Sequence, residues 1–183
     1  MRVQKLNLYV KKKNKFLKIL VKIIWDFFGK PLISSKLPGT YWRKFMFIFF
    51  GAKIGKGGKI KTNIKISEPW NLSIGDHCWI GENVWIDNIA LIKIGNRVCI
   101  SQGVYLCTGN HNFKKDLFDL ILEKIVIEDD CWIAAQSIIG PGSFLKRGSV
   151  SSLGSVVSGI LQEDGIYRGN PAKLLKSKDD NLN

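Results

Sequence analysis

Aliphatic residues recur at every sixth position over much of this chain. From residue 127 onward, the first five blocks of six also carry a small residue at the fifth place. The residues that open these blocks are Ile127, Ile133, Ile139, Leu145, Ser151 and Val157. This period belongs neither to an amphipathic helix, which repeats about every 3.6 residues, nor to a simple alternating strand. It predicts a coil with three flat sides of six residues each, in which every side points one residue into a central stack.

The same period appears between residues 54 and 106, with a regular slip. The blocks restart at Ile54, Ile74 and Ile94, and each interval of twenty residues corresponds to three blocks and a two-residue insertion at one corner. Glycine follows the aliphatic residue at several corners, where we expect its tolerance of unusual backbone angles to be required. These glycines are Gly55, Gly75, Gly81, Gly95 and Gly140. The sequence therefore predicts an all-β fold, a parallel β-helix.

The repeat is interrupted once, between Leu106 and Ile127. We expect residues 108–124 to leave the coil as a loop, and such loops on a rigid scaffold are frequent carriers of function. The loop contains His111, and an imidazole suits the removal of a proton from an alcohol or an amine. Several groups could orient that ring. They are Asp116, Asp119, Glu128 or a backbone carbonyl, and the sequence does not choose among them.

The amino-terminal part of the chain lacks the repeat. Residues 16–28 are apolar around most of a helix and carry lysines on one stripe, and we expect Pro31 and the SSKLPG stretch at residues 34–39 to end this helix. Residues 41–50 form a second short apolar segment. The first helix is shorter than the ~20 residues of a membrane span. Two interpretations remain open: the helices cover the open end of the coil, or they rest on an anionic membrane surface.

The charge is concentrated in the same region. The net charge is +13, and residues 1–65 hold 17 Lys and Arg but a single acid, Asp26. Nucleic-acid binding is disfavoured, because these lysines accompany apolar helices and not polar base-reading side chains. A metal site is not expected, because the four cysteines form no C-x-x-C pair and only two histidines are present. Cys78 and Cys131 occupy inward-facing small positions, and reduced thiols indicate a cytoplasmic protein.

Several phrases carry a family resemblance. IGDHCWIGENVWIDNIALIKIGNRVCISQGVYLCTGNHNF, IVIEDDCWIAAQSIIGPG and YRGNPAK stand at residues 74–113, 125–142 and 167–173. Together they resemble the left-handed β-helix, or hexapeptide-repeat, acyltransferases, and most closely the O-acetyltransferases of exopolysaccharide biosynthesis of the colanic-acid type. These are relatives of the maltose and galactoside acetyltransferases. The resemblance covers residues 29–177.

This resemblance implies a homotrimer in which acetyl-CoA binds between two subunits. The general base of the family falls on His111, and a backbone amide near Ala134 or Ala135 would meet the oxyanion. The resemblance also implies positions along a coenzyme groove and positions that contact the acceptor sugar. The coenzyme positions are Trp132, Ala134, Ala135, Leu153, Ser158, Asn170, Lys173 and Lys176, and the acceptor positions are Trp85, Asp87 and Asn88.

The chain departs from the family pattern at two places. Asn112 stands where an aspartate usually follows the histidine, and Gly159 replaces a lysine near a coenzyme phosphate, a loss for which Lys173 and Lys176 could compensate.

We therefore expect three parts: a basic amphipathic helical extension (1–50), a β-helix acyltransferase domain (51–166) with its loop at 108–124, and a coenzyme-groove segment with a tail (167–183). The expected activity is transfer of acetyl to a hydroxyl of a sugar or lipid-linked saccharide, by a cytoplasmic enzyme that contacts the inner membrane face through residues 1–50. Three alternatives stay open at this point. The chain could be a non-catalytic scaffold, could acetylate a small non-sugar acceptor, or could be a metal-dependent hydratase, for which two separated histidines make a poor ligand set.

Overall fold

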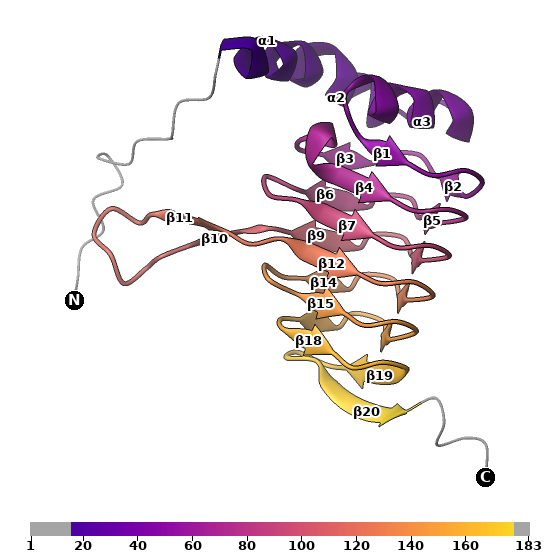
Figure 1. Ribbon diagram of the computed structural model, residues 1–183, viewed down its shortest axis with the longest axis vertical. Coiled ribbons are helices and arrows are strands. Elements are labelled where there is room, and N and C mark those ends of the chain that lie inside the picture. The colour runs from indigo at the N-terminus through magenta and orange to yellow at the C-terminus, as the bar shows by residue number, and fades with distance from the viewer. Residues whose placement is uncertain (1–15, 178–183) are drawn as a thin grey trace.

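The computed structural model describes residues 16–177. A parallel β-solenoid forms the body, helices cover its amino-terminal end, and one hairpin projects from its side (Figure 1). The first sheet comprises β1 (Lys53–Ile54), β4 (Leu72–Ile74), β7 (Ile92–Ile94), β12 (Ile125–Ile127), β15 (Phe144–Leu145) and β18 (Ile160–Leu161). The second comprises β2 (Lys59–Ile60), β5 (Trp79–Ile80), β8 (Cys99–Ile100), β13 (Trp132–Ile133), β16 (Val150–Ser151), β19 (Gly165–Arg168) and β20 (Lys173–Ser177). The third comprises β3 (Lys65–Ile66), β6 (Trp85–Asp87), β9 (Tyr105–Cys107), β14 (Ile138–Ile139) and β17 (Val156–Val157).

The aliphatic residues that open each block of six form the core, as predicted. Ile74 pairs with Ile94 and Ile94 with Ile127, so identical positions stack from coil to coil along the first sheet. All three side chains are buried. The small fifth residues are buried as well: Cys131, Ser137, Ser143, Ser149 and Ser155. The hexapeptide period thus sets both the parallel register and the inward stack, and the predicted parallel β-helix is confirmed.

The corner glycines are required for a reason other than the one expected. None of the five predicted corner glycines has a positive φ. Close approach between coils is the cause instead, because a Cβ on Gly55 would lie 2.7 Å from the carbonyl oxygen of Gly75, and one on Gly75 would lie 2.6 Å from that of Gly95. Left-handed conformations occur later in each turn, at residues such as Asn83 and Gln136.

A continuous run of helical turns covers the open end of the solenoid. It comprises α1 (Phe16–Ile24), the π-helical η2 (Trp25–Gly29) and α2 (Lys30–Ile33), followed by α3 (Thr40–Phe49). Trp25, Ile33 and Phe47 are buried and extend the solenoid core, which confirms the capping interpretation. No helix among residues 16–177 is both long and apolar enough to cross a bilayer.

The helix continues past Pro31 to Ile33 and ends where the SSKLPG stretch begins, so the second of the two expected stop signals marks its end. A wider π-helical turn directly precedes Pro31, and such a turn accommodates the missing N–H donor of proline. Gly29 is needed in this turn, because a Cβ there would lie 2.0 Å from a ring carbon of Trp25. The first fifteen residues of the expected extension 1–50 lie outside the described residues.

Arg43 holds the connection between α2 and α3. Its guanidinium is fully buried and donates to the carbonyl oxygens of Gly39 at 2.6 Å, of Ser35 at 3.1 Å and of Leu37. The same group lies 4.4 Å from the centroid of the Trp42 ring. Burial lowers the pKa of Arg43 from its ordinary value, but that value is high enough for the group to stay charged. One cation therefore fixes the loop that orients α3.

Replacing Arg43 with methionine is expected to destabilise the protein by about 2–3 kcal/mol, because partly buried carbonyls lose a charged donor. Urea unfolding followed by circular dichroism measures the change. The matched control is Lys44→Met, which removes the neighbouring cation of α3 and should shift the midpoint much less. Equal effects of the two variants would contradict the assigned role of Arg43.

Candidate functional site

The interruption in the repeat forms an antiparallel hairpin at the corner between the third and first sheets. Its strands are β10 (Gly109–His111) and β11 (Leu120–Leu122), and His111 pairs with Leu120. In Figure 1 the hairpin extends away from the solenoid and does not fold back over a neighbouring coil. The loop predicted at 108–124 is therefore an arm that carries His111 outward.

A backbone carbonyl orients the His111 ring, which answers the question that the sequence left open. Nδ1 of His111 lies 2.8 Å from the carbonyl oxygen of Phe118. Since a carbonyl only accepts, Nδ1 carries the proton, and in the neutral ring Nε2 is then the basic nitrogen. The Phe118 ring also stacks on the imidazole, with centroids 4.3 Å apart and planes 7° apart. Phe118 therefore fixes both the tautomer and the plane of the ring.

Phe118 has an unusual backbone conformation in this arrangement. Its φ is 53°, in the left-handed region that bulky side chains rarely adopt. Such residues cluster at functional sites. The carbonyl that faces His111 thus belongs to a residue held in place by the turn of the hairpin.

A polar cluster at the end of β6 lies at the base of this hairpin. The Asp87 carboxylate accepts hydrogen bonds from the Ser67 hydroxyl at 2.7 Å and from the Tyr105 hydroxyl at 3.3 Å. The backbone carbonyl of Asp87 accepts from Thr108, just before the hairpin begins. Burial, together with the neighbouring Cys107 and Asp87, raises the pKa of Tyr105, so its hydroxyl stays protonated and donates. The predicted acceptor residue Asp87 and the predicted base are therefore brought to one corner.

The two other predicted acceptor residues differ from one another. Trp85 is partly exposed and stacks on Tyr105, with centroids 4.5 Å apart. Asn88 is fully buried, and its amide donates to the Glu68 carbonyl at 2.6 Å and accepts from the Glu68 amide at 3.0 Å. Asn88 therefore joins two coils at this corner, and we assign it no contact with an acceptor.

The predicted coenzyme residues near the thioester lie elsewhere, on the second sheet and its corner with the third. Trp132 opens β13, is half-exposed, and donates from Nε1 to the Ser101 hydroxyl at 3.0 Å. Ala134 and Ala135 follow at the corner. The carbonyl of Ala135 accepts from the amide of Gly154, next to Leu153, so these positions stack along one edge.

The two alanines are not equivalent as donors to an oxyanion. The Ala134 amide donates to the Ser151 carbonyl at 2.9 Å within the ladder between coils. The Ala135 amide makes no hydrogen bond within residues 16–177. It occupies the second place of a turn closed by the bond from Ser137 to Ala134, and its N–H is available at the surface.

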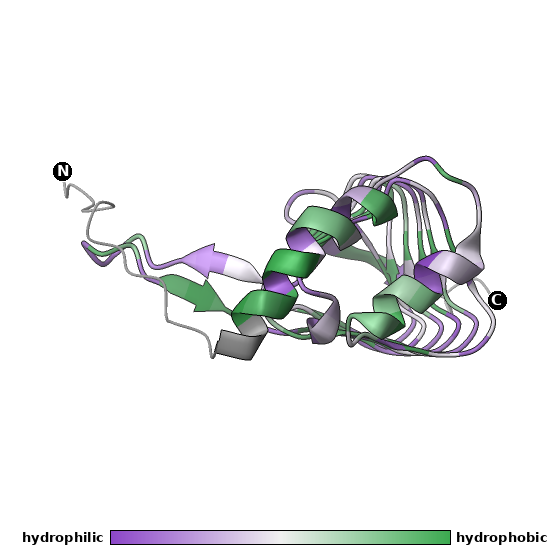
Figure 2. Cartoon of the chain, turned by 90° about the horizontal axis from the view of Figure 1, so that it is seen from above, coloured by the Kyte–Doolittle hydropathy of each residue, from purple (hydrophilic) through white to green (hydrophobic). Residues whose placement is uncertain are grey.

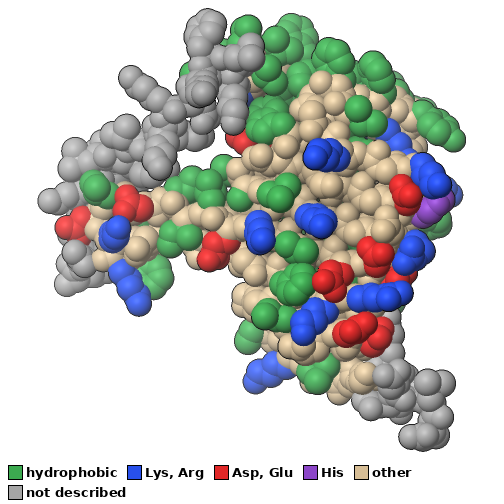
Figure 3. All heavy atoms as spheres, viewed as in Figure 1, with side chains coloured by type: hydrophobic (Ala, Val, Ile, Leu, Met, Phe, Trp, Pro, Cys, Tyr) green, Lys and Arg blue, Asp and Glu red, His purple; other side chains and the backbone are tan. Residues whose placement is uncertain are grey.

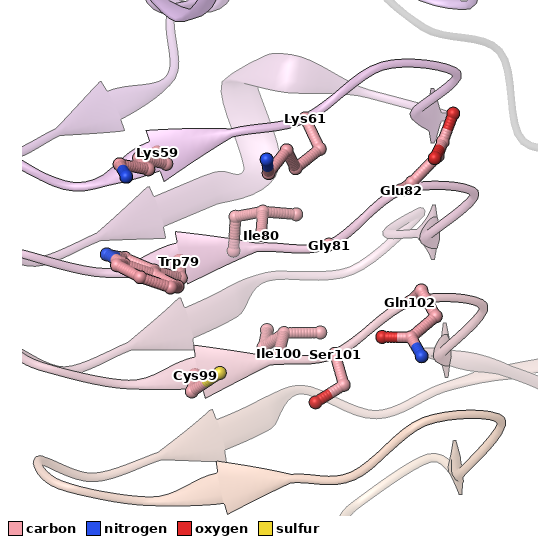
Figure 4. A pocket seen from close by; sticks show the side chains of 10 residues that line it. All are labelled: Lys59, Lys61, Trp79, Ile80, Gly81, Glu82, Cys99, Ile100, Ser101 and Gln102. Carbon is pink, nitrogen blue, oxygen red and sulfur yellow. The ribbon is translucent and has the colours of Figure 1, made fainter.

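A groove continues this edge toward the cap. It has a volume of about 350 Å³ and lies over the second sheet on the first three coils (Figure 4). Trp79 and Trp132 pair with Cys99 on either side of it in one row of the second sheet, and Trp79 and Cys99 line the groove. The Lys59 ammonium lies 4.7 Å from the centroid of the Trp79 ring. The other lining residues are Lys61, Ile80, Gly81, Glu82, Ile100, Ser101 and Gln102.

Sequence reasoning missed this groove, although the signal was present. Trp79 and Trp132 follow the two buried cysteines in matching phrases, and Cys99 is the smaller residue at the equivalent place of the intervening coil. The place of Cys99 beside these tryptophans becomes clear only when successive coils are aligned in the structure.

The remaining predicted coenzyme residues are exposed at the last coils. Leu153 lies at the corner between the second and third sheets, and Ser158 at the corner between the third and first sheets. Asn170 precedes β20, which pairs antiparallel with β19 and carries Lys173 and Lys176. The two lysines thus lie at the opposite end of the solenoid from the cap.

His111 and the predicted coenzyme residues near the thioester lie on different sides of one chain. The hairpin with His111 leaves the corner between the third and first sheets, whereas Trp132 lies on the second sheet, across the solenoid (Figure 1). A rigid solenoid cannot bring them together. A single chain therefore does not assemble His111 with the expected coenzyme groove.

The two buried cysteines and the second histidine contribute no side chain to this site. All four cysteines are free thiols, and Cys78 and Cys131 are buried as predicted. His77 is exposed at a corner. Among the residues that the structure describes, no group of three or more His, Cys, Asp or Glu side chains could hold a metal ion.

Comparison with known proteins finds clear relatives, although no family model matches the chain. WcaF of Escherichia coli, named as a colanic acid biosynthesis acetyltransferase, is 38% identical over 137 residues, which cover 75% of each chain.

Two solved structures share the fold. The hexapeptide-repeat acetyltransferase of Vibrio cholerae complexed with acetyl coenzyme A superposes with a TM-score of 0.83 at 24% identity and covers 92% of both chains. A galactoside acetyltransferase in complex with coenzyme A has a TM-score of 0.79 at 16% identity and covers 92% of this chain and 86% of its own.

Proposed function

This chain belongs to the hexapeptide-repeat acetyltransferases, and we propose that it transfers acetyl from acetyl-CoA to a hydroxyl of a sugar or lipid-linked saccharide, with His111 as the general base. Its membership makes it an acyltransferase that uses acetyl-CoA as co-substrate. The relative WcaF is named for the biosynthesis of colanic acid, which supports a saccharide acceptor. The observation that carries the proposal is the bond from His111 Nδ1 to the Phe118 carbonyl, because it makes Nε2 the proton acceptor.

The proposed reaction is a direct transfer. His111 Nε2 removes the proton from the acceptor hydroxyl as that oxygen attacks the thioester carbonyl. The resulting oxyanion accepts a hydrogen bond from the Ala135 amide, which has no partner within the described chain. The intermediate then expels the coenzyme thiolate, and the imidazolium returns its proton to the sulfur. No covalent acyl-enzyme is formed.

The proposed active unit is a homotrimer in which His111 of one subunit meets the groove of the next. The hairpin carries His111 outward, and Trp132 and Ala135 lie across the solenoid. Cyclic symmetry lets each subunit give its hairpin to one neighbour and receive another. We place the pantetheine arm along Trp132 and Leu153, and the phosphates near Lys173 and Lys176, because lysine acts there as a point charge.

The proposed acceptor lies between the Asp87 cluster of one subunit and the groove of its neighbour. Trp79 is half-exposed in the groove, where a sugar ring can contact its indole, and Trp85, whose ring stacks on Tyr105, can contact the acceptor with the part that stays exposed. Lys59 and Lys61 favour an acceptor that carries an acidic or phosphate group. The four reduced cysteines support a cytoplasmic location.

The direct test is a thiol-release assay with acetyl-CoA, corrected for hydrolysis, against neutral, acidic and polyprenyl-phosphate-linked saccharides. Acceptor-dependent release of coenzyme is expected with a saccharide. Release only with small non-sugar alcohols or amines would overturn the acceptor assignment. Absence of coenzyme binding in calorimetry would instead support a non-catalytic scaffold.

Replacing Ala135 with proline tests the proposed oxyanion donor without disturbing the turn. Pro141 occupies the equivalent place at the next corner of the solenoid, where Ser143 bonds back to Gly140 as Ser137 does to Ala134. Proline is favoured at this turn position and removes only the amide hydrogen. We expect kcat to fall by about 10²–10³-fold with little change in the melting temperature. Ala135→Ser, which keeps the amide, is the control, and similar losses in both variants would refute the assignment.

A further inference from the structure

The outer surface of the helical cap exposes a continuous series of large apolar side chains. Phe27 and Phe28 are 73% and 72% exposed, and Phe49 is 69% exposed. Figure 2 looks down on the cap and shows these helices largely as hydrophobic, and Figure 3 shows hydrophobic side chains along the same end. We call this set the cap face. It consists of Ile19, Leu20, Ile23, Ile24, Phe27, Phe28, Leu32, Leu37, Tyr41, Phe45, Ile48 and Phe49.

The cap face is separate from the side of the helices that packs on the solenoid. On the first helical run, Trp25 and Ile33 are buried at the core, whereas Phe27 and Phe28 point outward. On α3 the exposed residues recur at the third or fourth place, as the positions of Tyr41, Phe45, Ile48 and Phe49 show. Capping the solenoid therefore does not account for these side chains, and an apolar patch of this kind indicates a binding surface.

The charge around the cap face defines its partner. Residues 16–50, which include the cap helices, hold six Lys and Arg against one acid. Asp26, the single acid, already pairs with Lys22 at 3.5 Å and with Lys30 at 2.6 Å. Lys36 is exposed on the connection to α3 and forms no ion pair with a described residue. The partner must therefore offer both an apolar layer and a high density of negative charge.

We propose that the cap face docks on the interface of an anionic lipid bilayer. Aromatic and aliphatic side chains enter the boundary between headgroups and acyl chains, while the surrounding lysines neutralise anionic headgroups. A second copy of this chain is the less suitable partner, because joining two cap faces would bring two strongly basic regions together. The docking does not depend on acetyl transfer.

Vesicle co-sedimentation tests the proposal with the full chain. We expect binding to phosphatidylcholine vesicles that contain 25% phosphatidylglycerol, and at least tenfold weaker binding to pure phosphatidylcholine or in 0.5 M NaCl. Phe27→Glu/Phe28→Glu should lower the affinity for anionic vesicles at least tenfold, because charge is placed in the apolar layer. The matched control is Leu174→Glu/Leu175→Glu, which changes two exposed leucines at the opposite end of the solenoid and should bind as the wild type does.

The controls separate the possible results. Circular dichroism and thermal unfolding show whether each variant is folded. Loss of binding in the folded Phe27/Phe28 variant alone supports the proposal. Equal binding by that variant would overturn it in favour of simple attraction between lysines and lipid. Absence of vesicle binding together with concentration-dependent association in sedimentation velocity, abolished by the same substitutions, would overturn it in favour of a second copy.

Discussion

His111→Ala is expected to lower kcat/KM for acetyl transfer by about 10³-fold, within the range of general-base catalysis. The methyl group cannot accept the proton of the acceptor hydroxyl, so attack on the thioester would require an unassisted alcohol. The affinity for acetyl-CoA should change little, because the proposed coenzyme groove lies on the neighbouring subunit. Steady-state kinetics with the thiol-release assay measure the first quantity, and calorimetry measures the second.

The chain supplies its own matched control in His77. That histidine is exposed at a corner of the solenoid and lies outside the hairpin, so His77→Ala should keep wild-type kinetics. Loss of folding in His111→Ala is not expected, because the hairpin projects from a core that it does not fill. Wild-type turnover in a folded His111→Ala protein would reject the base assignment.

The position of His111 shows where prediction from sequence succeeds and where it ends. The hexapeptide period locates the coil, its register and the single interruption, because one buried aliphatic residue per side is a strong and repeated signal. The partner of the imidazole is a carbonyl of Phe118, which leaves no mark on side-chain patterns. Three of the four candidates for that role were side chains, and only the turn of the hairpin selects the backbone.

The lining of the groove over the second sheet depends on which residues lie next to each other in successive coils, and the linear sequence does not show this directly. Trp132 was predicted from its phrase, whereas Trp79 and Lys59 become neighbours only when coils of twenty residues are superimposed. The same conversion shows that the corner glycines are required by contact between coils. Asn88 is the opposite case, since the family resemblance implied a contact with the acceptor, whereas its buried side chain bonds to the Glu68 backbone of the preceding coil.

The groove and the cap lie close together along the solenoid. Lys59 and Lys61 belong to the first coil, directly after α3, and the proposed phosphate lysines lie on the last strand. If acetyl-CoA enters from the carboxyl-terminal end, the acceptor reaches the thioester from the cap end. A saccharide linked to a membrane lipid would approach from that side. The proposed acceptor and the proposed cap face therefore both favour an orientation in which the cap end of the solenoid faces the membrane.

Mixed trimers provide the sharpest test of the proposed division of the site between subunits. His111→Ala lacks the base, and Ala135→Pro lacks the oxyanion donor, so each protein alone should be nearly inactive. When the two are unfolded, mixed in equal amounts and refolded, a subunit interface regains both groups if an Ala135→Pro chain donates its hairpin to a His111→Ala chain. Random assembly gives this arrangement at about one quarter of the interfaces, so about a quarter of wild-type activity should return.

The two variants carry different affinity tags, and purification through one tag and then the other confirms that mixed trimers have formed. Mixed trimers without recovered activity would show that both groups act within one chain, or that one of them has no catalytic role.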